Sequence, residues 1–157
     1  MIKNVYGDIL EAKENIICHQ VNCLGVMGAG LAKQIKNRYP EVYEYYYNWC
    51  MRHNKEELLG RVILVQTEQY SRYIANVFGQ IGIKSYKDGC VTNYEALENG
   101  LLVVKDEAKK CGWSVAIPYK IGCGLAGGNW YIVHSIIQKV FSDYDVTIYR
   151  LRGYNDR

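Results

Sequence analysis

Two glycine-rich segments carry the residues best suited to binding a phosphorylated ligand. The first is N-C-L-G-V-M-G-A-G, residues 22–30, and the second is I-G-C-G-L-A-G-G, residues 121–128. Glycine lets the backbone approach a ligand closely, so that N–H groups can converge on it. Each segment precedes a helical pattern, and a helix N-terminus adds unpaired N–H donors. Either segment alone suits a tight turn equally well, but the two at equivalent strand ends predict a diphosphate clamp.

Two common nucleotide-binding motifs are excluded. A P-loop requires Gly-Lys-Ser/Thr, and this tripeptide does not occur. The dinucleotide fingerprint requires a third glycine for close packing, whereas the run that starts at Gly28 has Lys33 in that place. No acidic residue ends a following strand at the expected distance. The sequence therefore disfavours an NAD-dependent oxidoreductase.

Four polar or aromatic residues near these segments each have a functional and a structural interpretation. Asp8 could accept a hydrogen bond from an amino group such as that of adenine, or it could cap a turn. Asn22 could hold ribose hydroxyls or simply order its loop. His19 lies in an apolar strand pattern, where a hydrogen-bonded core histidine is commoner than a catalyst. Tyr149 could stack on a base or pack in the core.

The elements that must position these residues alternate along the chain. Periodicity and turn residues predict strands over residues 2–6, 15–21, 61–67, 72–78, 113–118 and 145–151. Helices are predicted over 28–39, from Pro40 onward, from Thr92 onward through a capping box with Glu95, and over 129–141. This alternation predicts an α/β sheet covered on both faces. In such sheets ligands bind at the carboxyl ends of the strands, where both glycine-rich segments fall.

The composition is that of a globular protein with one domain. The chain has 157 residues, 49% of them apolar and 22% charged, and we expect residues 1–157 to form a single unit. The formal net charge of +3 is too small to indicate nucleic-acid binding by itself. No apolar run has transmembrane length and no signal-peptide pattern opens the chain. We therefore expect a cytoplasmic protein without membrane partners, and its small size suggests a monomer.

The six cysteines have no arrangement that indicates a metal site. None forms a C-x-x-C pair, and no cysteine–histidine spacing resembles that of zinc ligands. Several lie in apolar runs, so we interpret them as small core residues in a reducing compartment. No metal and no cofactor are expected.

Longer stretches of the sequence resemble a known family. They are Gly7-Asp8-Ile9, H-Q-V-N-C-L-G-V-M-G-A-G-L-A over residues 19–32, I-P-Y-K-I-G-C-G-L-A-G-G-N-W over 117–130, and T-I-Y-R-L over 147–151. With these motifs the chain resembles a macrodomain over nearly its whole length. The resemblance implies a three-layer α/β/α fold around a mixed, mostly parallel sheet. It also implies binding of ADP-ribose or a derivative, with ADP-ribosylated macromolecules as further partners.

The ligand-binding residues implied by this resemblance end strands or open helices. They are Asp8 and Ile9 for adenine, Asn22 for the distal ribose, Gly28, Ala29 and Gly30 for that ribose and its phosphate, Gly122, Cys123, Gly124 and Leu125 for the diphosphate, and Tyr149 and Leu151 for adenosine.

The branch that the chain is most similar to contains terminal ADP-ribose protein glycohydrolase and ADP-ribose 1″-phosphate phosphatases. The glycohydrolases use a lysine where this chain has Gln80 and an aspartate where it has Ala126. A lysine nucleophile assisted by a carboxylate is an intelligible mechanism, and both groups are missing here. Lys84 or Lys87, beyond Gln80, could replace the lysine.

These departures favour dephosphorylation of ADP-ribose 1″-phosphate over glycosidic cleavage. Catalysis would come from orientation of the substrate and from backbone donors, with His19 and Asn22 as the candidates for steering water. Two alternatives stay open. One is a non-catalytic module that reads or sequesters ADP-ribose, and the other is a glycohydrolase that removes ADP-ribose from protein or nucleic acid with a different residue set.

Overall fold

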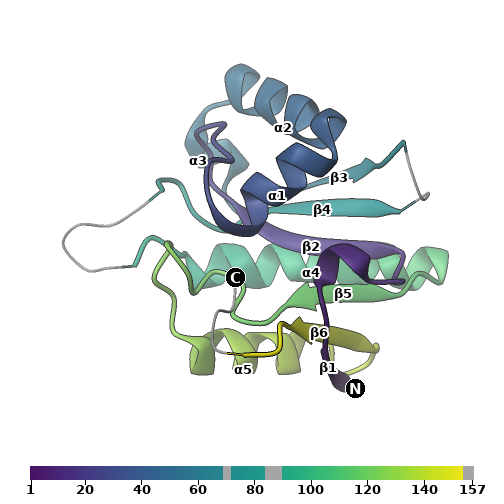
Figure 1. Ribbon diagram of the computed structural model, residues 1–157. Coiled ribbons are helices and arrows are strands. Elements are labelled where there is room, and N and C mark those ends of the chain that lie inside the picture. The colour runs from purple at the N-terminus through teal and green to yellow at the C-terminus, as the bar shows by residue number, and fades with distance from the viewer. Residues whose placement is uncertain (69–71, 84–89, 154–157) are drawn as a thin grey trace.

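The computed structural model describes residues 1–68, 72–83 and 90–153, and its centre is a six-stranded sheet (Figure 1). The strands are β1 (Ile2–Tyr6), β2 (Ile16–Val21), β3 (Val62–Gln66), β4 (Tyr73–Phe78), β5 (Val115–Pro118) and β6 (Val146–Arg150). Their order is β1-β6-β5-β2-β4-β3. Only the edge pair β3–β4 is antiparallel, so the sheet is mixed and mostly parallel, as predicted.

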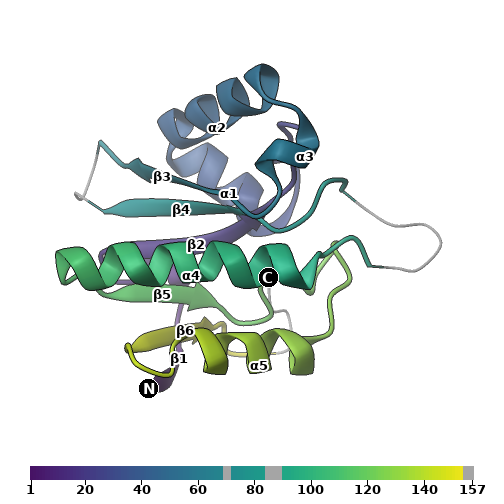
Figure 2. The same cartoon turned by 180° about the vertical axis from the view of Figure 1, so that it is seen from behind.

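Helices cover both faces of this sheet (Figures 1 and 2). One face carries the 3-10 turn η1 (Ile9–Glu11) and the helices α1 (Gly30–Arg38), α2 (Pro40–Arg52) and α3 (Lys55–Leu58), and the other carries α4 (Tyr94–Cys111) and α5 (Trp130–Val140). A separate cluster of buried apolar side chains lies beneath each helical layer. The predicted three-layer α/β/α architecture is confirmed. Within the described residues, no helix combines the length and the apolar character needed to span a bilayer.

The strand β2 is buried along nearly its whole length, which explains why its sequence is mainly apolar. It has sheet neighbours on both sides, β4 and β5, and helices above and below. Successive side chains therefore alternate between two buried environments rather than between core and solvent. Ile17 and Val21 belong to the cluster under α1 and α2, whereas Ile16 and Cys18 belong to the cluster under α4 and α5. The last residues of β2 consequently enter the site from a rigid element.

The N-terminus of α4 differs from the predicted capping box. The cap is Asn93, whose side-chain oxygen accepts a hydrogen bond from the backbone N–H of Ala96 at 2.9 Å. Thr92 lies one residue earlier, so the box predicted between Thr92 and Glu95 is wrong. The Thr92 hydroxyl instead donates to the carbonyl oxygen of Gly122 at 2.6 Å. A tertiary contact has taken the group that could have capped the helix.

The first helix also begins later than predicted. Gly28 and Ala29 remain in the loop, and α1 starts at Gly30, whose φ is +57°. Pro40 opens α2 as predicted, because proline lacks the N–H that a helix leaves unused in its first turn. The short elements η1 and α3 were not predicted. At a length of three and four residues they are too short to show a helical period.

Candidate functional site

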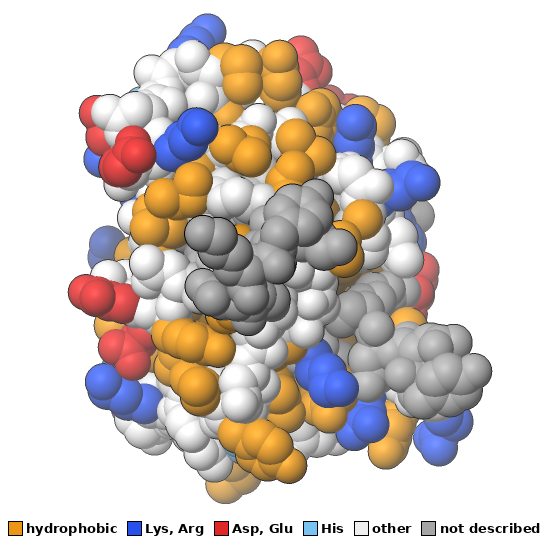
Figure 3. Space-filling view, turned by 90° about the vertical axis from the view of Figure 1, so that its left-hand side faces the viewer, with side chains coloured by type: hydrophobic (Ala, Val, Ile, Leu, Met, Phe, Trp, Pro, Cys, Tyr) orange, Lys and Arg blue, Asp and Glu red, His pale blue; other side chains and the backbone are white. Residues whose placement is uncertain are grey.

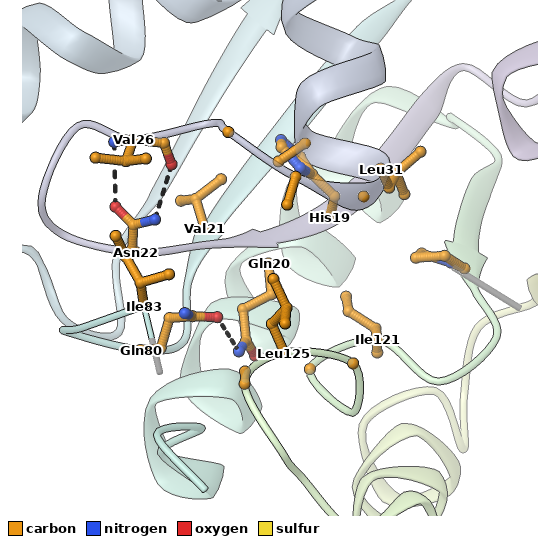
Figure 4. A pocket seen from close by; sticks show the side chains of 18 of the residues that line it. His19, Gln20, Val21, Asn22, Val26, Leu31, Gln80, Ile83, Ile121 and Leu125 are labelled. Carbon is orange, nitrogen blue, oxygen red and sulfur yellow. Dashed lines mark hydrogen bonds between the residues drawn. The ribbon is translucent and has the colours of Figure 1, made fainter. Parts of the chain in front are cut away.

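A cavity of about 570 Å³ opens at the carboxyl ends of the central strands. Figure 4 shows it between the loop after β2, the segment after β4 and the loop after β5. Its lining is formed by His19, Gln20, Val21, Asn22, Val26, Gly28, Ala29, Gly30, Leu31, Ala32, Gln80, Ile83, Pro118, Lys120, Ile121, Gly122, Gly124, Leu125 and Ala126. Both glycine-rich segments therefore contribute to a single cavity.

The structure brings together most, but not all, of the predicted site residues. Those that line the cavity are His19, Asn22, Gly28, Ala29, Gly30, Gly122, Gly124 and Leu125. The residues outside the lining are Asp8, Ile9, Cys123, Tyr149 and Leu151. All but Cys123 in this second set were assigned to adenine or adenosine, so the enclosed space corresponds to the part predicted for ribose and phosphates.

The loop after β2, residues 22–29, is ordered by side chains. The Asn22 carboxamide oxygen accepts hydrogen bonds from the backbone N–H groups of Leu24 and Val26, at 3.0 and 3.3 Å, and its nitrogen donates to the Val26 carbonyl at 2.8 Å. The buried Tyr46 hydroxyl, from α2, lies 2.7 Å from the same oxygen and 2.8 Å from the Asn22 carbonyl oxygen. Asn22 thus holds the loop and also borders the cavity.

The loop after β5, residues 119–129, is ordered mainly by its own backbone. Cys123 N–H donates to the Lys120 carbonyl at 2.9 Å, and Gly128 N–H donates to the Gly122 carbonyl at 2.9 Å. Gly122 has a φ of +74°, in the left-handed region that glycine adopts without strain. The N–H of Val91 ties the loop to the chain ahead of α4 by donating to the Ala126 carbonyl at 2.7 Å. The result is a compact turn whose shape depends on small residues.

Three side chains connect the segments after β2, β4 and β5. The amide nitrogen of Gln20 donates to the side-chain oxygen of Gln80 at 2.8 Å and to the Thr92 hydroxyl at 2.9 Å. Thr92 in turn reaches Gly122, and the Gln80 nitrogen donates to the Gly82 carbonyl at 2.7 Å. Gln80, the residue found where the glycohydrolases have lysine, is therefore fixed in a neutral network at the cavity wall.

His19 is a buried histidine whose tautomer is set by its neighbour. Its Nε2 lies 2.6 Å from the Asn76 side-chain oxygen, and the Asn76 nitrogen donates to the Ile63 carbonyl at 3.0 Å. Asn76 therefore presents an acceptor, so His19 Nε2 carries the proton and Nδ1 holds the lone pair. Burial lowers the pKa of His19 to about 4, although the bond to Asn76 opposes the shift. The imidazole is neutral at physiological pH.

The residues predicted to border adenosine gather beside the cavity. The Asp8 carboxylate accepts a hydrogen bond from the Leu10 N–H at 2.9 Å, so it caps η1. The Tyr149 ring packs near Gly7, and its hydroxyl donates to the Glu14 carboxylate. Burial and that carboxylate raise the pKa of Tyr149 to about 12. Asp8 and Tyr149 thus lie in one neighbourhood, formed by the ends of the parallel pair β1 and β6.

The lining favours binding of an anion over acid–base chemistry. The described residues that line the cavity include no carboxylate, and Lys120 is the one that carries a charge. Ala29, the N-cap of α1, offers no side-chain acceptor, so the first turn of the helix has no side-chain cap, and its residues Gly30 and Leu31 line the cavity. Burial raises the pKa of the Cys123 thiol to about 11, which excludes a thiolate nucleophile near neutral pH.

The view onto this edge of the sheet agrees with that reading (Figure 3). Hydrophobic side chains are spread over the face around its centre, and several Lys and Arg side chains gather in its lower right part. Within the described ranges, no three His, Cys, Asp or Glu side chains come together as a metal site would require.

Sequence reasoning missed several lining residues. The chief ones are Gln20, Leu31, Ala32, Pro118, Lys120 and Ile121. Gln20 directly follows the predicted residue His19, and Lys120 lies two residues before Gly122. Strand alternation at the end of β2 would have turned either His19 or Gln20 toward the second loop. Lys84 and Lys87, considered as replacements for a catalytic lysine, lie outside the described residues.

Comparison with known proteins gives a consistent result. The family model described as Macro domain matches residues 18–137. A protein from Mycobacterium tuberculosis named DNA ADP-ribosyl glycohydrolase is 32% identical over 98% of this chain, which spans only 43% of that protein. A Meyerozyma guilliermondii ADP-ribose 1″-phosphate phosphatase is 24% identical, with 86% of this chain and 91% of the relative covered. The solved macrodomain of M. tuberculosis DarG superposes with a TM-score of 0.81 at 30% identity, covering 95% of this chain and 97% of that one.

Proposed function

This chain belongs to the macrodomain family, and from that membership we propose that its cavity binds ADP-ribose or a derivative and hydrolyses ADP-ribose 1″-phosphate. The observation that carries the proposal is the meeting of two glycine-rich loops and the uncapped N-terminus of α1 around one cavity. Backbone N–H groups and a helix N-terminus are suited to phosphate oxygens. The names of both relatives reported above involve ADP-ribose, which supports this ligand class.

In this proposal the adenosine lies beside Asp8, Ile9, Tyr149 and Leu151, outside the enclosed space. The diphosphate passes the loop at Gly122–Leu125, where Gly122, Gly124 and Leu125 line the cavity. The Cys123 N–H already donates to the Lys120 carbonyl, so Cys123 helps to shape this loop. The distal ribose reaches the loop that Asn22 orders. A cavity of about 570 Å³ has the size usual for small-molecule sites.

Hydrolysis would proceed by attack of water on the phosphorus of the 1″-phosphate. The P–O bond to the sugar breaks, and ADP-ribose and inorganic phosphate leave. Because the described lining lacks a carboxylate, the rate would depend on substrate orientation and on backbone donors to the developing charge. Asn22 and His19 both line the cavity, and His19 Nδ1 has no hydrogen-bond partner among the described residues, so these two residues remain our candidates for steering the water.

Two other functions have specific support. Removal of ADP-ribose from nucleic acid or protein is favoured by the relative named for DNA, which covers 98% of this chain. A non-catalytic ADP-ribose reader is favoured by the neutral lining and by Gln80, which the amide network holds in place. The phosphatase ranks above the glycohydrolase because neither the lysine nor the aspartate of that reaction is present at positions 80 and 126.

Calorimetric titration with ADP-ribose tests the binding proposal. We expect micromolar or tighter binding to the native chain, and a loss of about tenfold in Asp8→Ala, the order expected when a charged hydrogen bond is removed. Asp8→Asn is the matched control for structure, because it keeps an acceptor for the Leu10 N–H while removing the charge. No binding to the native chain would refute the proposal.

Product analysis separates the three functions. Phosphate release from ADP-ribose 1″-phosphate supports the phosphatase, and release of ADP-ribose from modified DNA or protein supports the glycohydrolase. Tight binding of ligands that stay intact on long incubation supports the reader.

We extend the proposal to residues 1–157 as one macrodomain unit that acts as a cytoplasmic monomer. Sedimentation of the purified chain at the mass of one copy, 18.1 kDa, would support the monomeric state, and a doubled mass would contradict it.

A further inference from the structure

Lys120 has an unusual backbone at the rim of the cavity. It is the one non-glycine residue with a positive φ in the described parts of the chain, at +62°. Left-handed conformations are unfavourable for an L-residue with a side chain, because Cβ comes too close to the following carbonyl oxygen, and glycine would avoid that cost. The turn that imposes this conformation is closed by Ile121 N–H to the Pro118 carbonyl and Cys123 N–H to the Lys120 carbonyl. Strained residues that persist in this way are concentrated at functional sites.

The surroundings of Lys120 are cationic. Its ammonium lies 5.5 Å from the ring centroid of Tyr119, and the Arg150 guanidinium lies 4.2 Å from the same ring. No carboxylate of the described residues forms an ion pair with Lys120. The Lys120 charge also acts on the second glycine-rich loop, since it lowers the pKa of Cys123 against the larger effect of burial. The Lys120 charge therefore lies beside the second glycine-rich loop without an ion pair to a carboxylate in the described part of the chain.

We propose that Lys120 is a specificity-determining residue that contacts a phosphate of the bound ADP-ribose derivative. The inference rests on the proposed function and adds to it a side-chain charge for an anionic ligand, since Lys120 is the charged residue among the described residues that line the cavity. The strained backbone holds Lys120 among the lining residues, immediately before the glycine-rich loop that lines the same cavity at Gly122, Gly124 and Leu125. The residue contributes to binding and orientation and takes no proton.

The test uses four variants of the whole chain, titrated with ADP-ribose and with adenosine. Lys120→Met removes the charge and keeps most of the length, and we expect ADP-ribose affinity to fall about fivefold at low salt, since the ammonium is exposed. Added salt should narrow the difference. Adenosine has no phosphate, so its affinity should stay unchanged. Lys120→Arg should retain affinity, and Lys110→Met, an exposed charge control in the last turn of α4, should bind like the native chain.

Lys120→Gly distinguishes a lysine that binds ligand from one that only supports the fold, because it is expected to affect stability and ADP-ribose affinity in different directions. Glycine accepts the left-handed backbone, so its melting temperature should equal or exceed that of the native chain while ADP-ribose affinity falls as in Lys120→Met. Stability and binding would then move apart.

The outcomes separate this inference from the proposed function. If the native chain binds ADP-ribose and Lys120→Met binds it with the same affinity, the role of Lys120 is overturned and the cavity remains an ADP-ribose site. Equal losses for adenosine and ADP-ribose would also overturn it, because the damage would not concern phosphate. No ADP-ribose binding by the native chain would overturn both.

Discussion

The two glycine-rich loops face one cavity but are stabilised in opposite ways. The loop after β2 is held by side chains, the Asn22 carboxamide within it and the Tyr46 hydroxyl from α2. The loop after β5 is held by backbone bonds within itself and by the absence of side chains at Gly122 and Gly128. Two loops of similar sequence therefore depend on different interactions. We expect the first loop to be destabilised when a polar group is removed and the second when a carbon atom is added.

The largest expected effect concerns acidification, which acts on the strand leading into the first loop. Because the pKa of His19 is about 4 when folded and near 6.5 when unfolded, the unfolded chain binds this proton more readily. The free energy of unfolding should therefore fall between pH 6.5 and 4, by up to about 3 kcal/mol, and this effect should be absent above 6.5. Denaturant titrations across this range measure it.

His19→Gln is the control for the pH experiment, because it removes the titrating group. The part of the slope due to His19 should disappear in this variant. An identical slope in both proteins would show that other groups cause the acid sensitivity.

Gly128→Ala tests the second loop by adding one carbon. A Cβ at this position would lie 2.5 Å from the Gly122 carbonyl oxygen, which belongs to backbone and cannot easily move. We expect a loss of about 2 kcal/mol in unfolding free energy. Gly124→Ala, where no atom lies within 4 Å of the added carbon, should keep native stability. Equal stability of the two variants would remove the contrast between the loops.

Tyr46→Phe tests the first loop by removing one oxygen. The hydroxyl bonds Asn22 from a fully buried position, so its loss should cost about 1.5 kcal/mol. Tyr45→Phe, on the same helix but 54% exposed, should change stability little. Thermal melts of both variants measure the difference, and a Tyr46→Phe protein as stable as Tyr45→Phe would contradict the role given to this hydroxyl.

We expect the smallest of these stability changes from Thr92, whose hydroxyl donates a hydrogen bond to the Gly122 carbonyl in the second loop. Thr92→Val keeps the shape but removes the bonds to Gly122 and Gln20, at a cost of about 1 kcal/mol. Thr92→Ser retains the hydroxyl and should fall less. If valine and serine prove as stable as the native chain, the Thr92 hydroxyl does not contribute to holding this loop, which would sharpen the comparison further.

Much of the fold could be predicted because its periodicities are local. The β2 run and the α4 stripe follow directly from burial of the strand and of one helical face. The capping box failed at Thr92 because the competing partner, Gly122, is distant in sequence. Local rules cannot anticipate a hydroxyl recruited by another loop.

The sequence was sufficient to predict which loops form the site, but not how the side chains are placed within it. Glycine patterns located both walls of the cavity. The glycine pattern could not show that Asp8 and Tyr149 lie outside the lining of the cavity, since this depends on where η1 and β6 place these side chains in three dimensions. Nor could it show the positive φ of Lys120, because nothing in the residue type indicates such a backbone.

The Gln20 carboxamide lies against Gly79 and Gly122, and this close packing limits which substitutions these positions can accept. A Cβ on Gly79 would overlap its amide, and one on Gly122 would come within 2.8 Å of the same oxygen. Three positions far apart in the chain therefore share one small volume. We expect these positions to covary among related sequences. Alanine at 79 requires either that the Gln20 side chain moves away from its bonds to Gln80 and Thr92 or that a smaller residue occupies position 20, so a substitution at 20 makes a later one at 79 easier.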